Sequence, residues 1–273
     1  MNNKIKLIAA DMDGTLLDPE GKITKRTAQT IMKAQEKGLV FVPCTGRFPE
    51  NALLVVEKYG LSCPIIGLNG TAIRTENEVL YQKFMDEKLA QAILDTLERL
   101  GSVYYLFCED YIAVRRKGAL HHSQAEFGEQ AFKRYGLTFA NGDESGLRAP
   151  IDKVYKFYVY EDELSCPLTQ AIEALEHLPG IGITRSSATN FELMDQSVSK
   201  TTGLIVLSQI LGIRKEEIMA IGDYDNDIEM IAYAGLGVAM GNAVPEVKKA
   251  ADVITLDNQN DGVAHAIEKY CLL

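Results

Sequence analysis

A chain of 273 residues, 47% of them apolar and 24% charged, has the composition of a globular protein with one large or two modest domains. Its formal net charge of −10 argues against binding nucleic acid through a basic face. Five scattered cysteines without a C-x-x-C pair suit reduced thiols, and neither a signal peptide nor a membrane-spanning apolar run is recognised, so we expect a cytoplasmic protein without a membrane partner.

The first part of the chain alternates predicted strands and helices. Short apolar runs predict buried strands, and amphipathic stretches that follow a polar residue or a proline predict helices. The strands are predicted at 5–10, 39–44 and 64–68, with helices at 25–37 and 49–59 between them. This order predicts a parallel sheet with polar residues at its carboxyl edge, where ligands bind in open sheets.

The middle of the chain mixes hairpins with helices. The predicted elements are hairpins at 72–82 and 103–115, helices at 86–100, 118–135 and 164–178, strands at 153–160, 181–187 and 190–194, and a polar loop at 141–150. This mixture predicts an α+β insert with an antiparallel sheet, which we place at residues 84–190. His121 and His122 fall in the helix at 118–135 and are interpreted as surface residues.

From Ser199 onwards the alternation of strands and helices resumes. The predicted strands are 217–221, 236–240 and 253–256. The predicted helices are 200–211, 227–234, 244–251 and 263–270. The two ends of the chain, residues 1–83 and 191–273, are therefore predicted to form one discontinuous Rossmann-like core. The expected fold is α/β, a doubly wound parallel sheet interrupted by an inserted α+β cap domain at 84–190.

Two carboxylates stand at the end of the first predicted strand. Asp11 and Asp13 leave the strand on the same side, because side chains alternate along a strand, and Gly14 lets the backbone turn. Two carboxylates this close repel each other, so either one takes a proton or a cation lies between them. The alternative is a strand that ends in an ordinary Asp-Gly turn.

Three more carboxylates, Asp223, Asp225 and Asp227, follow the strand at 217–221. An EF-hand calcium loop is excluded, because an isoleucine and an alanine occupy the places of its glycine and its bidentate glutamate. Helix N-capping by aspartate is the simpler alternative. A hard cation with oxygen ligands accounts better for three acids, and Mg²⁺ fits best because it accepts one or two carboxylates together with phosphate oxygens.

Three further places have side chains or backbone suited to phosphate. Thr45 and Gly46 follow the second strand and offer a hydroxyl and an unencumbered N–H, and Gly241 and Asn242 have a similar arrangement. Lys200 begins a predicted helix, where the helix dipole disfavours a cation, so a nearby anion would compensate for its placement. The simpler alternatives are turns for the glycine pairs and a solvated side chain for the lysine.

Taken together, these stretches resemble the four motifs of the haloacid dehalogenase-like (HAD) phosphatases. The motifs are D-x-D-G-T at 11–15, Thr45, Lys200 and G-D-x-x-N-D at 222–227. The insertion point resembles that of the Cof-type branch, which carries a large α/β cap between the second and third motifs. The resemblance covers essentially the whole chain. Tyr224 is a departure, because many Cof-type members have Asn there.

The resemblance implies a role for each matching residue. Asp11 would be the nucleophile that forms an aspartyl-phosphate, and its carboxylate needs no base to activate it. Asp13 would first protonate the leaving alcohol and then deprotonate water, which requires it to hold a proton beside Asp11. The implied Mg²⁺ ligands are Asp11, the backbone carbonyl of Asp13 and Asp223, with Asp227 orienting a metal-bound water. The implied phosphate-binding residues are Thr45, Gly46, Lys200 and Asn226.

The sequence therefore predicts a Mg²⁺-dependent hydrolase of small phosphorylated metabolites. By resemblance, sugar phosphates are the first substrate class, with pyridoxal phosphate and flavin mononucleotide as others, and the cap contributes specificity. A phosphomutase on the same scaffold is one alternative, and it would require an activating bisphosphate. A non-catalytic phosphometabolite sensor is the other, although a sensor is expected to have lost an acid. Asp225 is expected to face solvent. Arg47 is a candidate for contact with the substrate, with a surface arginine as the simpler alternative, and the oligomeric state stays open.

Overall fold

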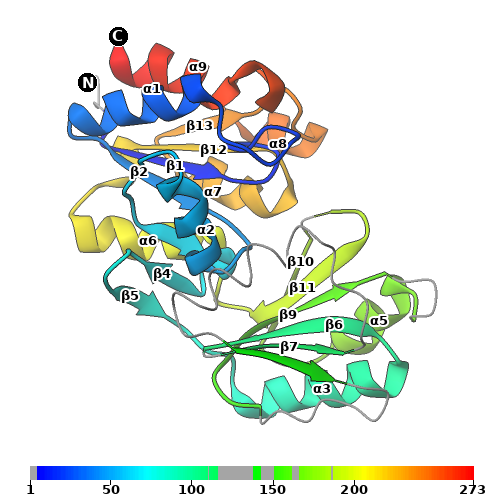
Figure 1. Cartoon of the computed structure of the whole chain (residues 1–273). Coiled ribbons are helices and arrows are strands. Elements are labelled where there is room, and N and C mark those ends of the chain that lie inside the picture. The colour runs from blue at the N-terminus through cyan, green and yellow to red at the C-terminus, as the bar shows by residue number, and fades with distance from the viewer. Residues whose placement is uncertain (1–4, 110, 116–137, 143–150, 162–165, 186) are drawn as a thin grey trace. The chain divides into compact units, whose positions relative to one another are not determined.

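The computed structural model of the protein describes residues 5–109, 111–115, 138–142, 151–161, 166–185 and 187–273. The chain divides into two units, one formed by residues 1–82 and 199–273 and the other by residues 83–198 (Figure 1). A parallel-sheet α/β core interrupted by a second unit with its own, mainly antiparallel sheet confirms the predicted fold class. None of the helices in the described part of the chain combines the length and the hydropathy that a bilayer crossing needs.

An eight-stranded sheet lies at the centre of the first unit, with the order β14-β13-β12-β1-β2-β3-β4-β5 among the described residues. Its parallel strands are β1 (Leu7–Asp11), β2 (Val40–Cys44), β3 (Ile65–Gly67), β12 (Ile218–Gly222), β13 (Leu236–Ala239) and β14 (Val253–Ile254). An antiparallel hairpin, β4 (Ala72–Arg74) and β5 (Val79–Gln82), extends one edge. All five residues of β1 are buried, which explains its uniformly apolar run before Asp11.

Helices cover both faces of this sheet (Figure 1). On one face, Leu7 and Ala9 of β1 share an apolar cluster with Leu204 and Leu207 of α6 (Lys200–Leu211), and α6 packs beside α7 (Ile228–Tyr233). On the other face, α1 (Lys25–Glu36) packs beside α9 (Gly262–Ile267). The remaining helical segments are α2 (Pro49–Glu57), α8 (Pro245–Ala250), η1 (Leu68–Gly70), η2 (Lys215–Glu217), η3 (Asp225–Asp227), η4 (Asn258–Asn260) and the π-helical η5 (Glu268–Leu272).

The second unit has its own six-stranded sheet, with the order β10-β11-β9-β6-β7-β8 in the described part. Its strands are β6 (Val103–Cys108), β7 (Tyr111–Arg115), β8 (Thr138–Gly142), β9 (Val154–Tyr160), β10 (Ile181–Thr184) and β11 (Asn190–Asp195). Alternate residues such as Tyr104, Leu106 and Phe157 pack in one cluster with α3 (Glu87–Leu100) and α5 (Leu168–Leu175). The sheet is antiparallel except for the β7–β8 pair, which is parallel.

The second boundary between the units differs from the predicted one. The sequence pattern places the end of the insert at residue 190, whereas the structure divides the chain after Val198. The reason is β11, which pairs antiparallel with both β9 and β10 and therefore belongs to the sheet of the second unit. The first boundary falls after Gln82 instead of after residue 83.

Several predicted elements are shorter in the structure. Within the described residues, the helix predicted at 164–178 corresponds to α5, which begins directly after Pro167. The strand predicted at 181–187 ends at Thr184. The helix at 227–234 starts as the 3₁₀ turn η3, and the α-helical part of 263–270 ends at Ile267. Residues 141–142, predicted as loop, belong to β8. The helix at 118–135 with His121 and His122, and most of the loop at 141–150, lie outside the described residues.

Candidate active site

The order of the strands brings the predicted site residues together at one edge of the core sheet. β1 lies between β2 and β12, so Asp11 at the end of β1 is flanked by Thr45 after β2 and Asp223 after β12. The chain runs outward in both directions from this centre, which makes it the switch point at which open parallel sheets bind ligands. Residues separated by more than two hundred positions therefore meet in one site.

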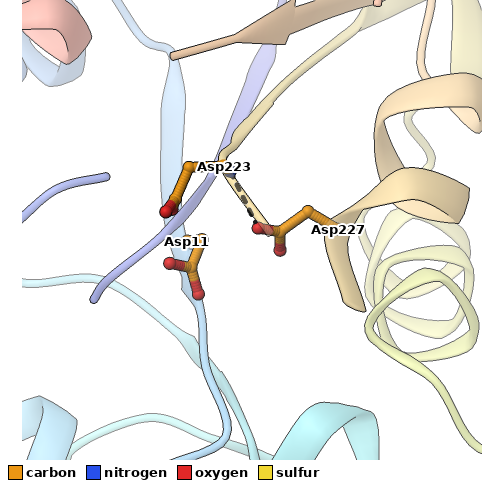
Figure 2. Close-up of side chains that lie close together, drawn as sticks. All are labelled: Asp11, Asp223 and Asp227. Carbon is orange, nitrogen blue, oxygen red and sulfur yellow. Dashed lines mark hydrogen bonds between the residues drawn. The ribbon is translucent and has the colours of Figure 1, made fainter. Parts of the chain in front are cut away.

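Three carboxylates converge at this edge (Figure 2). One oxygen from each of Asp11, Asp223 and Asp227 lies within 4.8 Å of the others. Asp11 and Asp227 are buried, and Asp223 is partly exposed. Asp227 Oδ2 accepts hydrogen bonds from the backbone N–H groups of Asp223, at 3.0 Å, and Tyr224, at 3.1 Å. Asp227 thus also fixes the loop that carries Asp223.

Lys200 lies between two of these acids. Its Nζ donates to Asp11 Oδ1 at 2.6 Å and to Asp227 Oδ1 at 2.7 Å, and its side chain is 1% exposed. It is the first residue of α6, which is capped by the Ser199 hydroxyl. Burial lowers the pKa of Lys200, but the charges and hydrogen bonds of the two carboxylates outweigh burial and raise it. These acids compensate for a cation at a helix start, as the sequence led us to expect.

The charges of this cluster test whether a metal ion would fit. Among the described residues, Lys200 is the only cation in contact with the three carboxylates, so two negative charges are uncompensated when all three are ionised. Burial raises the pKa of Asp11 well above its usual value despite Lys200, and the other acids add to this effect. Burial also raises the pKa of Asp223 to about 6, against the hydrogen bond from Thr15. A cluster of carboxylate oxygens that lacks two positive charges for neutrality has the donor type and the charge that suit a hard divalent cation.

Asp13 lies outside the buried cluster and has a partner that the sequence did not predict. Its side chain is 58% exposed. Arg47 Nε donates to Asp13 Oδ2 at 2.8 Å, and a terminal guanidinium nitrogen contacts Oδ1. Burial lowers the pKa of Arg47, but the Asp13 contact outweighs this and raises it. Arg47, for which the sequence left a substrate contact and a surface position as alternatives, is partly exposed and contacts Asp13 at the edge of the site.

The other predicted phosphate-binding residues lie at the same edge. Thr45 is buried; its N–H donates to the Ile66 carbonyl at 2.8 Å, and its hydroxyl oxygen accepts from the Arg47 N–H at 3.1 Å. Gly46 follows it and is partly exposed. Because the sheet uses the Thr45 backbone, its hydroxyl is the group able to donate to a phosphate oxygen.

The loop after β12 brings a further residue to the site. Asn226 is partly exposed, and its Nδ2 donates to Asn69 Oδ1 at 3.4 Å. Asn69 is buried and follows β3 with a left-handed φ of 55°. The sequence analysis did not identify Asn69 as a site residue, although Asn69 also lies just after a core strand. Asp225 is exposed, as expected, and Tyr224 contributes its backbone N–H to Asp227.

The site has a carboxylate at the end of the central strand, a buried lysine that contacts this carboxylate, and an acidic cluster that fits a cation. These features define a class of α/β enzyme suited to phosphate esters. The sequence profile of the haloacid dehalogenase-like hydrolases matches residues 8–267, and the chain belongs to this family. The motif resemblance seen in the sequence is thereby confirmed.

Curated relatives and solved structures match along almost the full chain. The 5-amino-6-(5-phospho-D-ribitylamino)uracil phosphatase YcsE of Bacillus subtilis is 32% identical, covering 98% of this chain and 96% of its own. Phosphatase YwpJ of the same organism is 30% identical, covering 97% and 99%. A haloacid dehalogenase-like hydrolase structure from B. subtilis has a TM-score of 0.82 at 29% identity, covering 97% and 99%. The HAD subclass IIB sugar phosphatase BT4131 has a TM-score of 0.80 at 26% identity, covering 98% and 100%. The chain is thus a phosphoric monoester hydrolase of the HAD type.

Proposed function

We propose that this protein is a Mg²⁺-dependent phosphatase of small phosphorylated metabolites that works through an aspartyl-phosphate on Asp11. The observation that carries the proposal is the ammonium of Lys200 between Asp11 and Asp227, in a buried cluster two charges short of neutrality. A dianionic phosphate needs positive charge where it meets an anionic nucleophile, and this cluster provides a lysine and a place for a cation.

The residues that would hold Mg²⁺ are the Asp11 and Asp223 side chains and the Asp13 backbone carbonyl. Asp227 would orient the site, because both of its oxygens already bind Lys200 and the loop of Asp223. When bound, the ion would neutralise phosphate charge and so permit the approach of a carboxylate. Thr45, Gly46, Lys200 and Asn226 would contact the phosphate oxygens.

The reaction would proceed in two balanced steps. An Asp11 oxygen attacks phosphorus, the phosphorus–ester oxygen bond breaks, and the leaving oxygen takes a proton from Asp13. Asp13 then takes a proton from water as that water attacks phosphorus, the bond to Asp11 breaks, and phosphate leaves. For the first step Asp13 must hold a proton on one oxygen, so one of its contacts with Arg47 has to open.

Sugar phosphates and related polyol phosphates are the proposed substrate class. The relative YcsE is named for a phospho-ribityl compound, and BT4131 is described as a sugar phosphatase, which supports this choice. Pyridoxal phosphate and flavin mononucleotide remain in the panel to be tested. We also propose a cytoplasmic location, since the five cysteines are free thiols, and no nucleic-acid partner.

The decisive experiment measures phosphate release from an aryl phosphate with and without Mg²⁺, for wild type, Asp11→Asn and Asp225→Asn. We expect Mg²⁺-dependent turnover that Asp11→Asn abolishes and that Asp225→Asn, a change at an exposed aspartate, leaves intact. Full activity of Asp11→Asn would contradict the nucleophile. Turnover that appears only with an added sugar bisphosphate would indicate a mutase, and metabolite binding without any turnover would indicate a sensor. A metabolite panel then identifies the substrate.

A further inference from the structure

Two asparagines far along the chain hold the loop that follows Asp13. Asn242 lies between β13 and α8, and its Nδ2 donates to the Gly14 carbonyl at 2.8 Å. Its Oδ1 accepts the backbone N–H of Asn258 at 3.1 Å, and Asn258 Nδ2 in turn donates to the Leu17 carbonyl at 2.9 Å. Both ends of the segment 14–17 are therefore tied to the carboxyl-terminal part of the core.

The loop turns at Gly14, whose φ of 89° is a conformation that favours glycine. Its own backbone hydrogen bonds, from the Leu16 N–H to the Asp11 carbonyl at 3.1 Å and from the Leu17 N–H to the Met12 carbonyl at 2.9 Å, leave the Gly14 carbonyl to Asn242. The loop also packs directly on a predicted metal ligand. A Cβ at Gly14 would lie 2.4 Å from Asp223 Oδ2, and the Thr15 hydroxyl donates to Asp223 Oδ1 at 2.6 Å. A small rotation of the loop would thus move Asp13 relative to Asp223.

The turn that carries Asn242 is itself fixed against the loop of Asp223. The Val244 N–H donates to the Asp223 carbonyl at 3.0 Å, and the Gly241 N–H donates to the Leu256 carbonyl at 3.0 Å. A Cβ on Gly241 would lie 2.7 Å from the backbone nitrogen of Asp257, so this turn packs closely against the backbone at Asp257. Asn242 therefore links the loop of one acid to the loop of the other.

We propose that Asn242 is a positioning residue for Asp13, which it orients through its hydrogen bond to the Gly14 carbonyl. The inference rests on the proposed function, because proton transfer from Asp13 is the step that depends on this orientation. An alkoxide leaving group, as in a sugar phosphate, requires that proton. A p-nitrophenolate leaves without it, so the rates of leaving-group release in a single turnover, before Asp13 acts as base, separate the acid step from the rest of the reaction.

The test compares the two substrates in wild type, Asn242→Ala and Asn242→Asp. The aspartate keeps an acceptor for Asn258 but cannot donate to Gly14. Because general acid catalysis contributes on the order of 10²–10⁴-fold, we expect partial misplacement to lower the single-turnover rate of alcohol release from the sugar phosphate about 10-fold in both variants. For the single-turnover release of p-nitrophenolate we expect less than about a 3-fold loss. Asn77→Ala, at an exposed turn between β4 and β5, is the matched control and should behave as wild type.

A second comparison uses Asp13→Ala, which should show the full difference between the substrates. Adding Asn242→Ala to it should cause no further loss that is specific to the sugar phosphate, because both changes act on one proton transfer. Equal losses on both substrates, or no loss, would overturn the role of Asn242. Wild type inactive on both substrates, or an active Asp11→Asn, would contradict the proposed function and the inference with it.

Discussion

Arg47 binds Asp13 with two guanidinium nitrogens, Nε donating to Oδ2 at 2.8 Å while the other contacts Oδ1. The pair joins the loop after β1 to the loop after β2. It also places the proposed acid at the rim of the site, apart from the buried carboxylates. Asp13 is thus oriented from its backbone by Asn242 and at its carboxylate by Arg47.

Replacing Arg47 should impair turnover. We expect Arg47→Ala to lower kcat/KM about 10-fold, since orientation of a general acid is worth part of its 10²–10⁴-fold contribution. Arg47→Lys should restore only part of the loss, because an ammonium lacks the planar fork of two parallel donors. Steady-state kinetics on the identified substrate provide the measurement. Arg214→Ala, at an exposed arginine paired with Glu217, is the control, and an equal loss there would argue against a specific role.

Replacing Lys200 should affect both activity and stability. Lys200→Met keeps a side chain of similar length but removes the charge between Asp11 and Asp227, so we expect kcat to fall at least about 10²-fold. Leaving two buried acids without their cation should cost on the order of 3–5 kcal/mol of unfolding free energy. Urea unfolding and kinetics measure the two effects. Lys25→Met, an exposed lysine at the first position of α1, should change neither, and an unaffected Lys200→Met would remove the basis of the proposed site.

The Asp223 carboxyl should make the metal-free protein less stable as the pH rises from about 4 to about 6. The pKa of Asp223 is about 6 in the folded protein, mainly because of burial, and about 3.9 in an unfolded chain. Between these values the folded state binds more protons, so its stability falls as the pH rises from about 4 to about 6. Thermal unfolding in a chelator should show this fall, reduced in Asp223→Asn. Added Mg²⁺ should raise Tm most at the higher pH, and a Mg²⁺ effect that is unchanged in Asp223→Asn would contradict its role as a ligand.

The second unit contains a buried ion pair whose removal should destabilise it. Lys156 and Glu192 are both 2% exposed in their side chains and form a salt bridge, with the ammonium 4.9 Å from the Phe107 ring centroid. Lys156→Met removes the ammonium that contacts the buried Glu192 carboxylate and should cost on the order of 3–5 kcal/mol. Lys153→Met, in a half-exposed pair with Glu109, should cost at most about 1 kcal/mol. Equal effects in thermal unfolding would contradict the difference in burial as the cause.

Local patterns were sufficient to locate most of the candidate site. An apolar run that ends in acid can be recognised within ten residues, and this located Asp11, Asp13, Asp223 and Asp227 at the ends of strands. Because parallel strands present their carboxyl ends at one edge, the same patterns indicated that these residues meet. The lysine at a helix start likewise signalled an anionic neighbour, and the change from strand–helix alternation to hairpins revealed an inserted unit.

Other features depend on contacts between distant segments, and only the tertiary structure decided them. The sequence of β11 predicts a short strand but not the sheet to which it belongs. Its pairing with β9 and β10 assigned it to the second unit. The partner of Asp13 was not readable from the sequence, nor was the bond from Asn242 to Gly14, 228 positions away. The periodicity of apolar residues along an element predicts which face a side chain occupies. The partners of that side chain depend on the order of the strands and on the course of the loops, which no local pattern encodes.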